Sequence, residues 1–181
     1  MLNTITGGWL LVFNFVIGSS TPSQLSFVPS YREISGYHSN NMVITTSAMN
    51  ELLTHMPYTQ LRFHCSKQQG STFHVATAAN STGNAVVQYF NGQTNVLPNS
   101  CNSFVRMEDD DSMLAAVCHD WGVNWAGKWG GAVPTEERLS SHPAWVIAAY
   151  HWLLLPDIPR IECDDYLGGV SPGDFWKVFV R

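Results

Sequence analysis

The chain has 181 residues, nine Lys and Arg against fourteen Asp and Glu, and a formal net charge of −5. This length suits one domain spanning residues 1–181, and the acidic balance excludes the basic patch that nucleic acid or an anionic lipid surface requires. Charged residues make up only 13% and aromatic residues 12%, a composition typical of extracellular β-rich domains.

The first predicted element is a strand over residues 9–17. Trp9, Leu11 and Phe13 lie on one face of an extended chain and other apolar residues on the opposite face, which is typical of a central strand. A bilayer span needs about 20 residues, so this run does not predict membrane insertion. Residues 19–30, rich in Ser and Pro, predict a loop.

A short amphipathic helix is predicted next, over residues 47–56. Ser47 is the expected N-cap, apolar residues follow at helical spacing, and Pro57 ends the pattern. Residues 61–65 then alternate apolar and polar, and residues 71–77 follow a turn sequence, so the two segments predict a β-hairpin.

The middle of the chain predicts two more strands. Residues 85–90, "AVVQYF", precede Asn91-Gly92, a dipeptide suited to a tight turn. Residues 104–107 form a second, shorter strand that leads into an acidic run. Residues 121–142, rich in Gly and Trp, show no period and predict a structured loop.

The C-terminal part contains one ambiguous segment. Residues 144–155, "AWVIAAYHWLLL", could form a helix capped by Ser141 or a long buried strand, which periodicity cannot separate; we favour the helix. Residues 173–181 alternate and predict a last strand. The predicted class is α+β: a β-dominated mixed domain with an antiparallel sheet, one or two short helices and long structured loops.

Four widely spaced cysteines contain no C-x-x-C pair and predict two disulfides; they are Cys65, Cys101, Cys118 and Cys163. Pairing in chain order, one of three connectivities, would join Cys65 with Cys101 and Cys118 with Cys163. Asn80 begins an Asn-Ser-Thr sequon in a turn-like stretch and is a candidate glycosylation site. Together these features favour a secreted, extracellular protein.

An acidic run, Glu108 to Asp111, precedes Cys118. Asp109 and Asp111 could present two carboxylates to calcium, with carbonyls and water completing the shell. Counted from Asp109, the sixth position is Leu114, so the run is not an EF-hand loop. The alternative is a solvated acidic turn.

The histidines allow two weaker hypotheses. His119 and Asp120 invite an acid/base interpretation, but the chain lacks the common hydrolase, metalloprotease and phosphate-loop motifs, and we expect no enzyme. His64 and His74 lie on opposing arms of the predicted hairpin and could approach a zinc ion. No third ligand is indicated, so exposed strand histidines are the favoured interpretation.

Three tryptophans, Trp121, Trp125 and Trp129, recur every fourth residue. The glycines among them argue against a helix, so the rings could line a loop-built surface. Flat aromatic faces beside polar groups suit sugars or acetyl groups. The alternative is that the rings form part of the core.

Several of these motifs together resemble a divergent fibrinogen-related domain. They are "GGWLLVFNF", the four cysteines, the D-x-D before a cysteine, "WAGKWGG" and "WKVFVR". The resemblance is to the fibrinogen C-terminal-like and intelectin-like domains of marine-invertebrate secreted or matrix proteins. It implies a lectin-like module that binds calcium through Asp109 and Asp111, with His119 and Trp121 beside the ligand pocket. Such domains usually close a small loop with a cysteine soon after the first, whereas here Cys118 is next followed by Cys163.

The sequence therefore predicts an extracellular, non-enzymatic recognition or adhesion module that binds carbohydrate or glycoprotein. Calcium is the expected cofactor, and the module could form an oligomer. One alternative is a structural matrix protein whose acidic stretches, 108–111 and 162–165, touch ions without a pocket. A hydrolase using His119 and a carboxylate is the third hypothesis.

Overall fold

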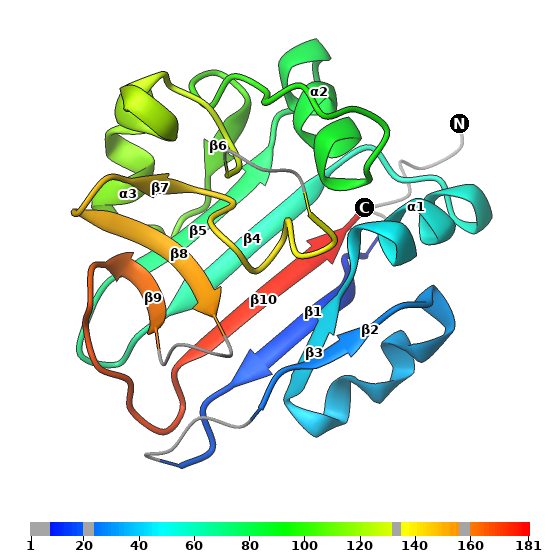
Figure 1. Ribbon diagram of the computed structural model, residues 1–181, viewed down its shortest axis with the longest axis horizontal. Coiled ribbons are helices and arrows are strands. Elements are labelled where there is room, and N and C mark those ends of the chain that lie inside the picture. The colour runs from blue at the N-terminus through cyan, green and yellow to red at the C-terminus, as the bar shows by residue number, and fades with distance from the viewer. Residues whose placement is uncertain (1–7, 20–23, 132–134, 156–159) are drawn as a thin grey trace, which may run out of the picture.

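A computed structural model describes residues 8–19, 24–131, 135–155 and 160–181. They form an α+β fold of two sheets and short helices, as the sequence predicts (Figure 1). The strands are β1 (Leu10–Val16), β2 (Ser26–Val28), β3 (Asn41–Ile44), β4 (Leu61–Ser66), β5 (Thr72–Thr77), β6 (Phe104–Arg106), β7 (Trp145–Val146), β8 (Tyr150–Leu155), β9 (Arg160–Asp165) and β10 (Phe175–Val180). The helices are α1 (Thr46–His55), α2 (Ser81–Phe90) and α3 (Met113–Ala116), with 3₁₀ helices η1 (Tyr31–Ser39), η2 (Cys118–Asp120) and η3 (Val123–Trp125).

The larger sheet has the strand order β2-β3-β1-β10-β4-β5-β6. All of its pairs are antiparallel except β2 with β3. The strands β1 and β10, far apart in the chain, pair in the interior of the sheet with Phe15 opposite Trp176. The central strand predicted over residues 9–17 is therefore confirmed, as are the hairpin β4–β5, the short strand β6 and the last strand β10.

The smaller sheet, β7-β8-β9, packs on one face of the larger one (Figure 1). Trp152 of β8 is fully buried, and its ring centroid lies 5.5 Å from that of Phe63 and 6.2 Å from that of Phe73. The Phe63 ring also packs against that of Phe90 of α2, with ring centroids 5.2 Å apart. One aromatic core thus joins both sheets and α2, and burying each such ring contributes a few kcal/mol.

Over β4 and β10, the opposite face of the larger sheet carries polar and charged side chains that are partly exposed. Along β4, Phe63 and Cys65 are buried whereas Arg62 and His64 are partly exposed. Along β10, Lys177 is likewise partly exposed between buried neighbours. The period of two thus separates a core face from a face that water can reach.

The predicted first helix is confirmed as α1, although its cap differs. Thr45, not Ser47, is the N-cap, and its hydroxyl accepts a hydrogen bond from the Ala48 N–H at 3.2 Å. The loop predicted over residues 19–30 contains β2, and its residues 20–23 lie outside the described part of the chain.

The strand predicted over residues 85–90 is wrong, because these residues form the second half of α2. Asn80 caps this helix, its side-chain oxygen accepting from the Gly83 N–H at 2.9 Å. Gly83, Val86, Val87 and Phe90 are buried at spacings of three and four residues, so the helical period was present. The β-branched pair within it favoured a strand only by propensity.

The helix favoured over residues 144–155 is also wrong, because this segment forms the hairpin β7–β8. Ala148 has φ +53°, and the Ala149 N–H bonds the Val146 carbonyl at 3.1 Å, which closes the turn. The strand β8 pairs along its length with β9. The extended alternative is correct because a partner strand satisfies its backbone groups.

Candidate functional site

The acidic run continues the hydrogen bonding of the sheet beyond β6. The Asp110 carboxylate accepts from the His74 N–H at 2.7 Å, and that of Asp111 accepts from the Thr72 N–H at 2.6 Å. The Asp110 side chain is fully buried and also pairs with Arg106. The run is therefore anchored along the edge of β5 rather than being a freely solvated turn.

Two histidines meet Asp109 on the face of the sheet that water reaches. His64 of β4 lies directly opposite His74 of β5, and their rings stack with centroids 3.6 Å apart and planes 4° from parallel. The Asp109 carboxylate lies 2.5 Å from His74 Nδ1 and 3.5 Å from His64 Nε2. The potential ligand atoms of the three residues all lie within 4.8 Å of one another. The structure thus supplies the third residue that the sequence does not indicate.

The surroundings tune the charge of this cluster. Burial, and next the nearby charge of His74, lower the pKa of His64 to about 4, although the Asp109 carboxylate acts in the opposite direction. For Asp109, burial raises the pKa, but the hydrogen bond and positive charge of His74 outweigh it, so the pKa lies below its usual value. At neutral pH the cluster therefore holds a neutral His64 imidazole and an ionised carboxylate.

Both predicted calcium ligands are exposed, but their carboxylates have different partners. Asp109 faces the two imidazoles, while Asp111 accepts the Thr72 N–H. Calcium prefers an all-oxygen shell of six to eight ligands. Calcium binding by Asp109 and Asp111 stays a prediction. The imidazole nitrogens beside Asp109 are a type of ligand that calcium sites rarely use.

Two of the predicted ligand-binding rings belong to the core, which corrects that prediction. Trp121 and Trp129 are fully buried, with ring centroids 4.8 Å apart. Their indole N–H groups donate to the Leu114 carbonyl at 2.7 Å and the Ser103 hydroxyl at 2.8 Å. The loop that carries them folds against Phe104 and Phe73 of the larger sheet, which leaves neither ring a face for a ligand.

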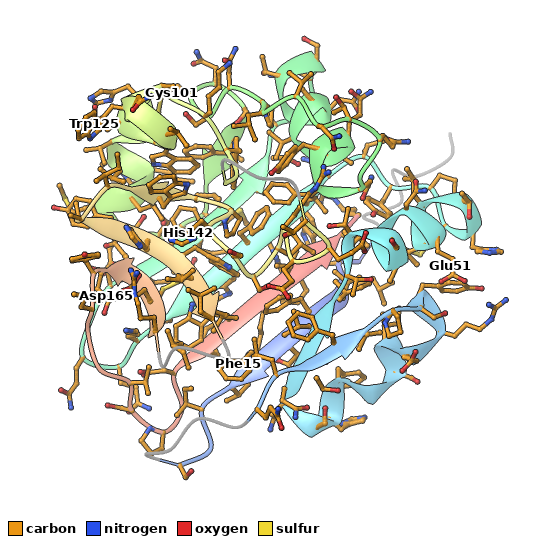
Figure 2. All side chains as sticks on the ribbon, in the orientation of Figure 1. Phe15, Glu51, Cys101, Trp125, His142 and Asp165 are labelled. Atoms are coloured by element: carbon orange, nitrogen blue, oxygen red, sulfur yellow. A yellow bond between two sulfur atoms is a disulfide. The ribbon has the colours of Figure 1, made fainter. Side chains whose placement is uncertain are left out.

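Trp125 and His119, by contrast, lie at the surface. Trp125 is 57% exposed, and Figure 2 shows it at the periphery of the molecule, in the same corner of the view as Cys101. Asn124 and Trp125 both adopt positive φ, +57° and +53°, which is uncommon for any residue with a side chain and rare for a bulky one. The His119 side chain is 71% exposed and lies 3.5 Å from that of Asp120. These two residues remain candidates for ligand contact.

Two disulfides are present, as predicted, but the pairing in chain order is wrong. Cys65 bonds to Cys163, and Cys101 bonds to Cys118. The first bond ties β4 to β9 and so joins the two sheets, while the second closes the segment that contains the acidic run. Pairing follows the packing of the sheets, which order along the chain does not reveal.

The sequon asparagine, Asn80, lies at the exposed N-terminus of α2. Its side-chain oxygen accepts from the Thr82 hydroxyl at 2.7 Å and from the Gly83 N–H. A glycan at this exposed position remains a prediction.

A buried charged network in the smaller sheet was not indicated by the sequence. The Glu162 side chain is fully buried and lies 2.8 Å from His151 Nδ1 and 2.9 Å from the Arg160 guanidinium. Burial raises the pKa of Glu162, but hydrogen bonds from His151, Leu167 and Arg160 outweigh it and lower the pKa to about 2. Among the described residues, every strong partner of this carboxylate is internal, which indicates a structural role.

Within the described ranges, no helix is both long and apolar enough to cross a membrane. Comparisons with protein-family models, with curated proteins and with solved structures found no match for this chain. The resemblance to fibrinogen-related domains therefore stays a prediction from the sequence motifs.

Proposed function

We propose that this protein is an extracellular, non-enzymatic recognition module that binds carbohydrate, free or on a glycoprotein, through Trp125. The observation that carries the proposal is a tryptophan that is 57% exposed and held at φ +53°. A flat indole face suits the C–H face of a sugar ring. The exposed side chains of His119 and Asp120, on the preceding η2, offer hydrogen-bonding groups.

The backbone around Trp125 is braced rather than loose. The Ser100 N–H donates to the Gly127 carbonyl at 2.9 Å and the Lys128 N–H to the Trp121 carbonyl at 3.0 Å. The Cys101–Cys118 disulfide closes the same region. A residue held in a sparsely populated conformation costs about 1–3 kcal/mol and persists only where the surroundings enforce it, which is common at ligand-contacting sites.

One further observation supports recognition over a structural matrix role. The acidic stretch 162–165, one of two expected to touch ions in a matrix protein, contains a Glu162 that is fully buried and an Asp164 that is only 8% exposed. Both carboxylates are bonded internally. Two disulfides fit an oxidising, extracellular location.

We expect Trp125→Ala to weaken glycan binding by about tenfold or more, because loss of one aromatic contact of about 1.4 kcal/mol has that effect. Binding is measured on a glycan array and then by titration with the best saccharide. Trp125→Gly should weaken binding to the same extent while leaving the melting temperature unchanged or higher, because glycine adopts this φ without strain.

The matched control is Leu167→Ala. Leu167 is 62% exposed and also has a positive φ, +57°, but it is aliphatic and lies after β9. Its substitution should leave glycan binding intact. The proposal would be contradicted if the unmodified protein bound no glycan on the array, or if Trp125→Ala bound glycans as tightly as the unmodified protein.

A further inference from the structure

The cluster of His64, His74 and Asp109 has no place in the proposed recognition of sugars by Trp125. Its residues come from β4, β5 and the turn after β6, and they meet on the face of the larger sheet away from the core. We propose that these three side chains form a binding site for a divalent first-row transition-metal ion, with zinc as the ion of best fit.

The geometry gathers three donors in one place. His64 and His74 pair directly across β4 and β5, so their rings stack with centroids 3.6 Å apart. Each ring has a nitrogen close to the Asp109 carboxylate. The donor atoms lie within 4.8 Å of one another. A tetrahedral zinc ion with ligands at about 2.1 Å needs them roughly 3.4 Å apart. Binding would therefore separate the Asp109 carboxylate from His74 Nδ1, now 2.5 Å apart, and tilt the two parallel rings toward the ion.

The donor types agree with this metal class. Two imidazole nitrogens and one carboxylate oxygen suit zinc and its late first-row neighbours, whereas calcium and magnesium favour oxygen alone. The Asp109 side chain is 57% exposed, so an ion there would keep an open position toward solvent. A water or a polar group of a ligand would complete the four-coordinate shell.

The supporting residues hold the site in place. Asp110 is fully buried, accepts the His74 backbone N–H and the Ser112 hydroxyl, and pairs with Arg106. This arrangement fixes the turn that delivers Asp109 to the histidines. The Nδ1 edge of the His74 ring faces Asp109, while the other ring nitrogen, Nε2, is buried and has no hydrogen-bond partner among the described residues.

Two cations flank the site and weaken it. Lys177 lies opposite His64 on β10, and Arg62 precedes His64 by two residues on the same face. The Lys177 ammonium lies over the Phe175 ring at 5.0 Å and the Arg62 guanidinium over the Phe179 ring at 4.0 Å. The aromatic faces therefore hold these positive charges near the site. Removing one of the two charges should strengthen metal binding, because it would no longer repel the ion.

The full chain, freed of metal with a chelator, is titrated with Zn²⁺ by calorimetry and, separately, with Co²⁺ by visible absorption. We expect one ion per chain and a higher melting temperature with zinc. His64→Gln and Asp109→Asn should each weaken binding by more than about tenfold, while Lys177→Gln should tighten it about twofold or more, since it removes a like charge. Asp109 is exposed, so its variant tests the site even where His64→Gln alters folding.

His38→Gln is the matched control, because His38 is exposed on η1, outside both the cluster and the proposed glycan site, and should contribute nothing to zinc binding. Undiminished zinc binding by His64→Gln and Asp109→Asn, or no binding by the unmodified chain, would overturn the proposal. Calcium binding that is lost in Asp109→Asn but kept in His64→Gln would also overturn it, in favour of the carboxylate site predicted from the sequence. The glycan measurements on Trp125 variants are independent of each of these outcomes.

Discussion

Replacing Cys65 and Cys163 together with alanine is expected to lower the free energy of unfolding by about 4–5 kcal/mol. The two cysteines are 98 residues apart in the chain, and the loop-entropy model gives about 4.7 kcal/mol for a loop of this size. The bond also ties β4 to β9 across the interface between the two sheets. Urea denaturation of the double variant, followed by tryptophan fluorescence, measures the loss.

The Cys101–Cys118 bond provides the comparison. It spans only 17 residues, so the corresponding double alanine variant should lose about 3 kcal/mol. A variant lacking Cys65 and Cys101 breaks both bonds and should be less stable than either matched variant. If that variant were instead as stable as a single-bond variant, the pairing in this structure would be wrong.

Glu162→Gln is expected to lower the free energy of unfolding by about 3 kcal/mol. Glu162 is fully buried between Arg160 and His151, and neutralising one member of a buried charged network typically costs about 3–5 kcal/mol. Glutamine preserves the volume, so the effect reports lost charge pairing rather than a cavity. Glu108→Gln is the control, since Glu108 is exposed and its substitution should have little effect.

The same carboxylate makes stability depend on pH. Its pKa is about 2 in the folded protein against an ordinary 4.5, so its contribution is complete above pH 4.5 and is lost as the pH falls toward 2. Thermal melts between pH 7 and pH 2.5 should therefore show a steep fall below pH 4.5 that is much weaker in Glu162→Gln. Equal slopes in the two proteins would show that the Glu162 carboxylate does not drive this dependence.

The His142 imidazole also makes the folded protein less stable as the pH falls, but at a higher pH than Glu162 does. Burial and the charge of His151 lower its pKa to about 4, from an ordinary 6.5. Because the unfolded chain takes up a proton that the folded chain excludes, stability falls as the pH drops from 6.5 toward 4. His142→Gln should flatten this part of the melting curve, and an unchanged slope would contradict the assignment.

The fold was predictable wherever local pattern and tertiary environment agree. The strand β1 is apolar on both faces because the aromatic core covers one face and η1 packs against the other, whereas β4 and β10 alternate because only one of their faces meets the core. Prediction failed at α2, where β-branched residues outweighed a helical spacing. It failed again at β7–β8, where the partner strand β9 contains Glu162 and Asp164, buried acidic residues that do not resemble a strand core.

The candidate sites likewise combine residues that a local pattern predicts with residues that only the tertiary packing brings in. A hairpin pattern places His64 and His74 on neighbouring strands, but Asp109 follows His74 by 35 residues and reaches it only because β6 pairs with β5. The three tryptophans spaced four apart look equivalent in the sequence. Two of them face the core and one faces water, because the loop folds against the larger sheet.

By itself, the sequence determined the α+β class, the strands at both ends of the chain, the β4–β5 hairpin and the presence of two disulfides, since these follow from side-chain period and cysteine number. Only the tertiary structure decided which cysteines pair, which tryptophan is exposed and which carboxylate joins the two histidines. Each of these depends on contacts between residues distant in the chain, and such contacts arise from the packing of whole sheets rather than from any local pattern.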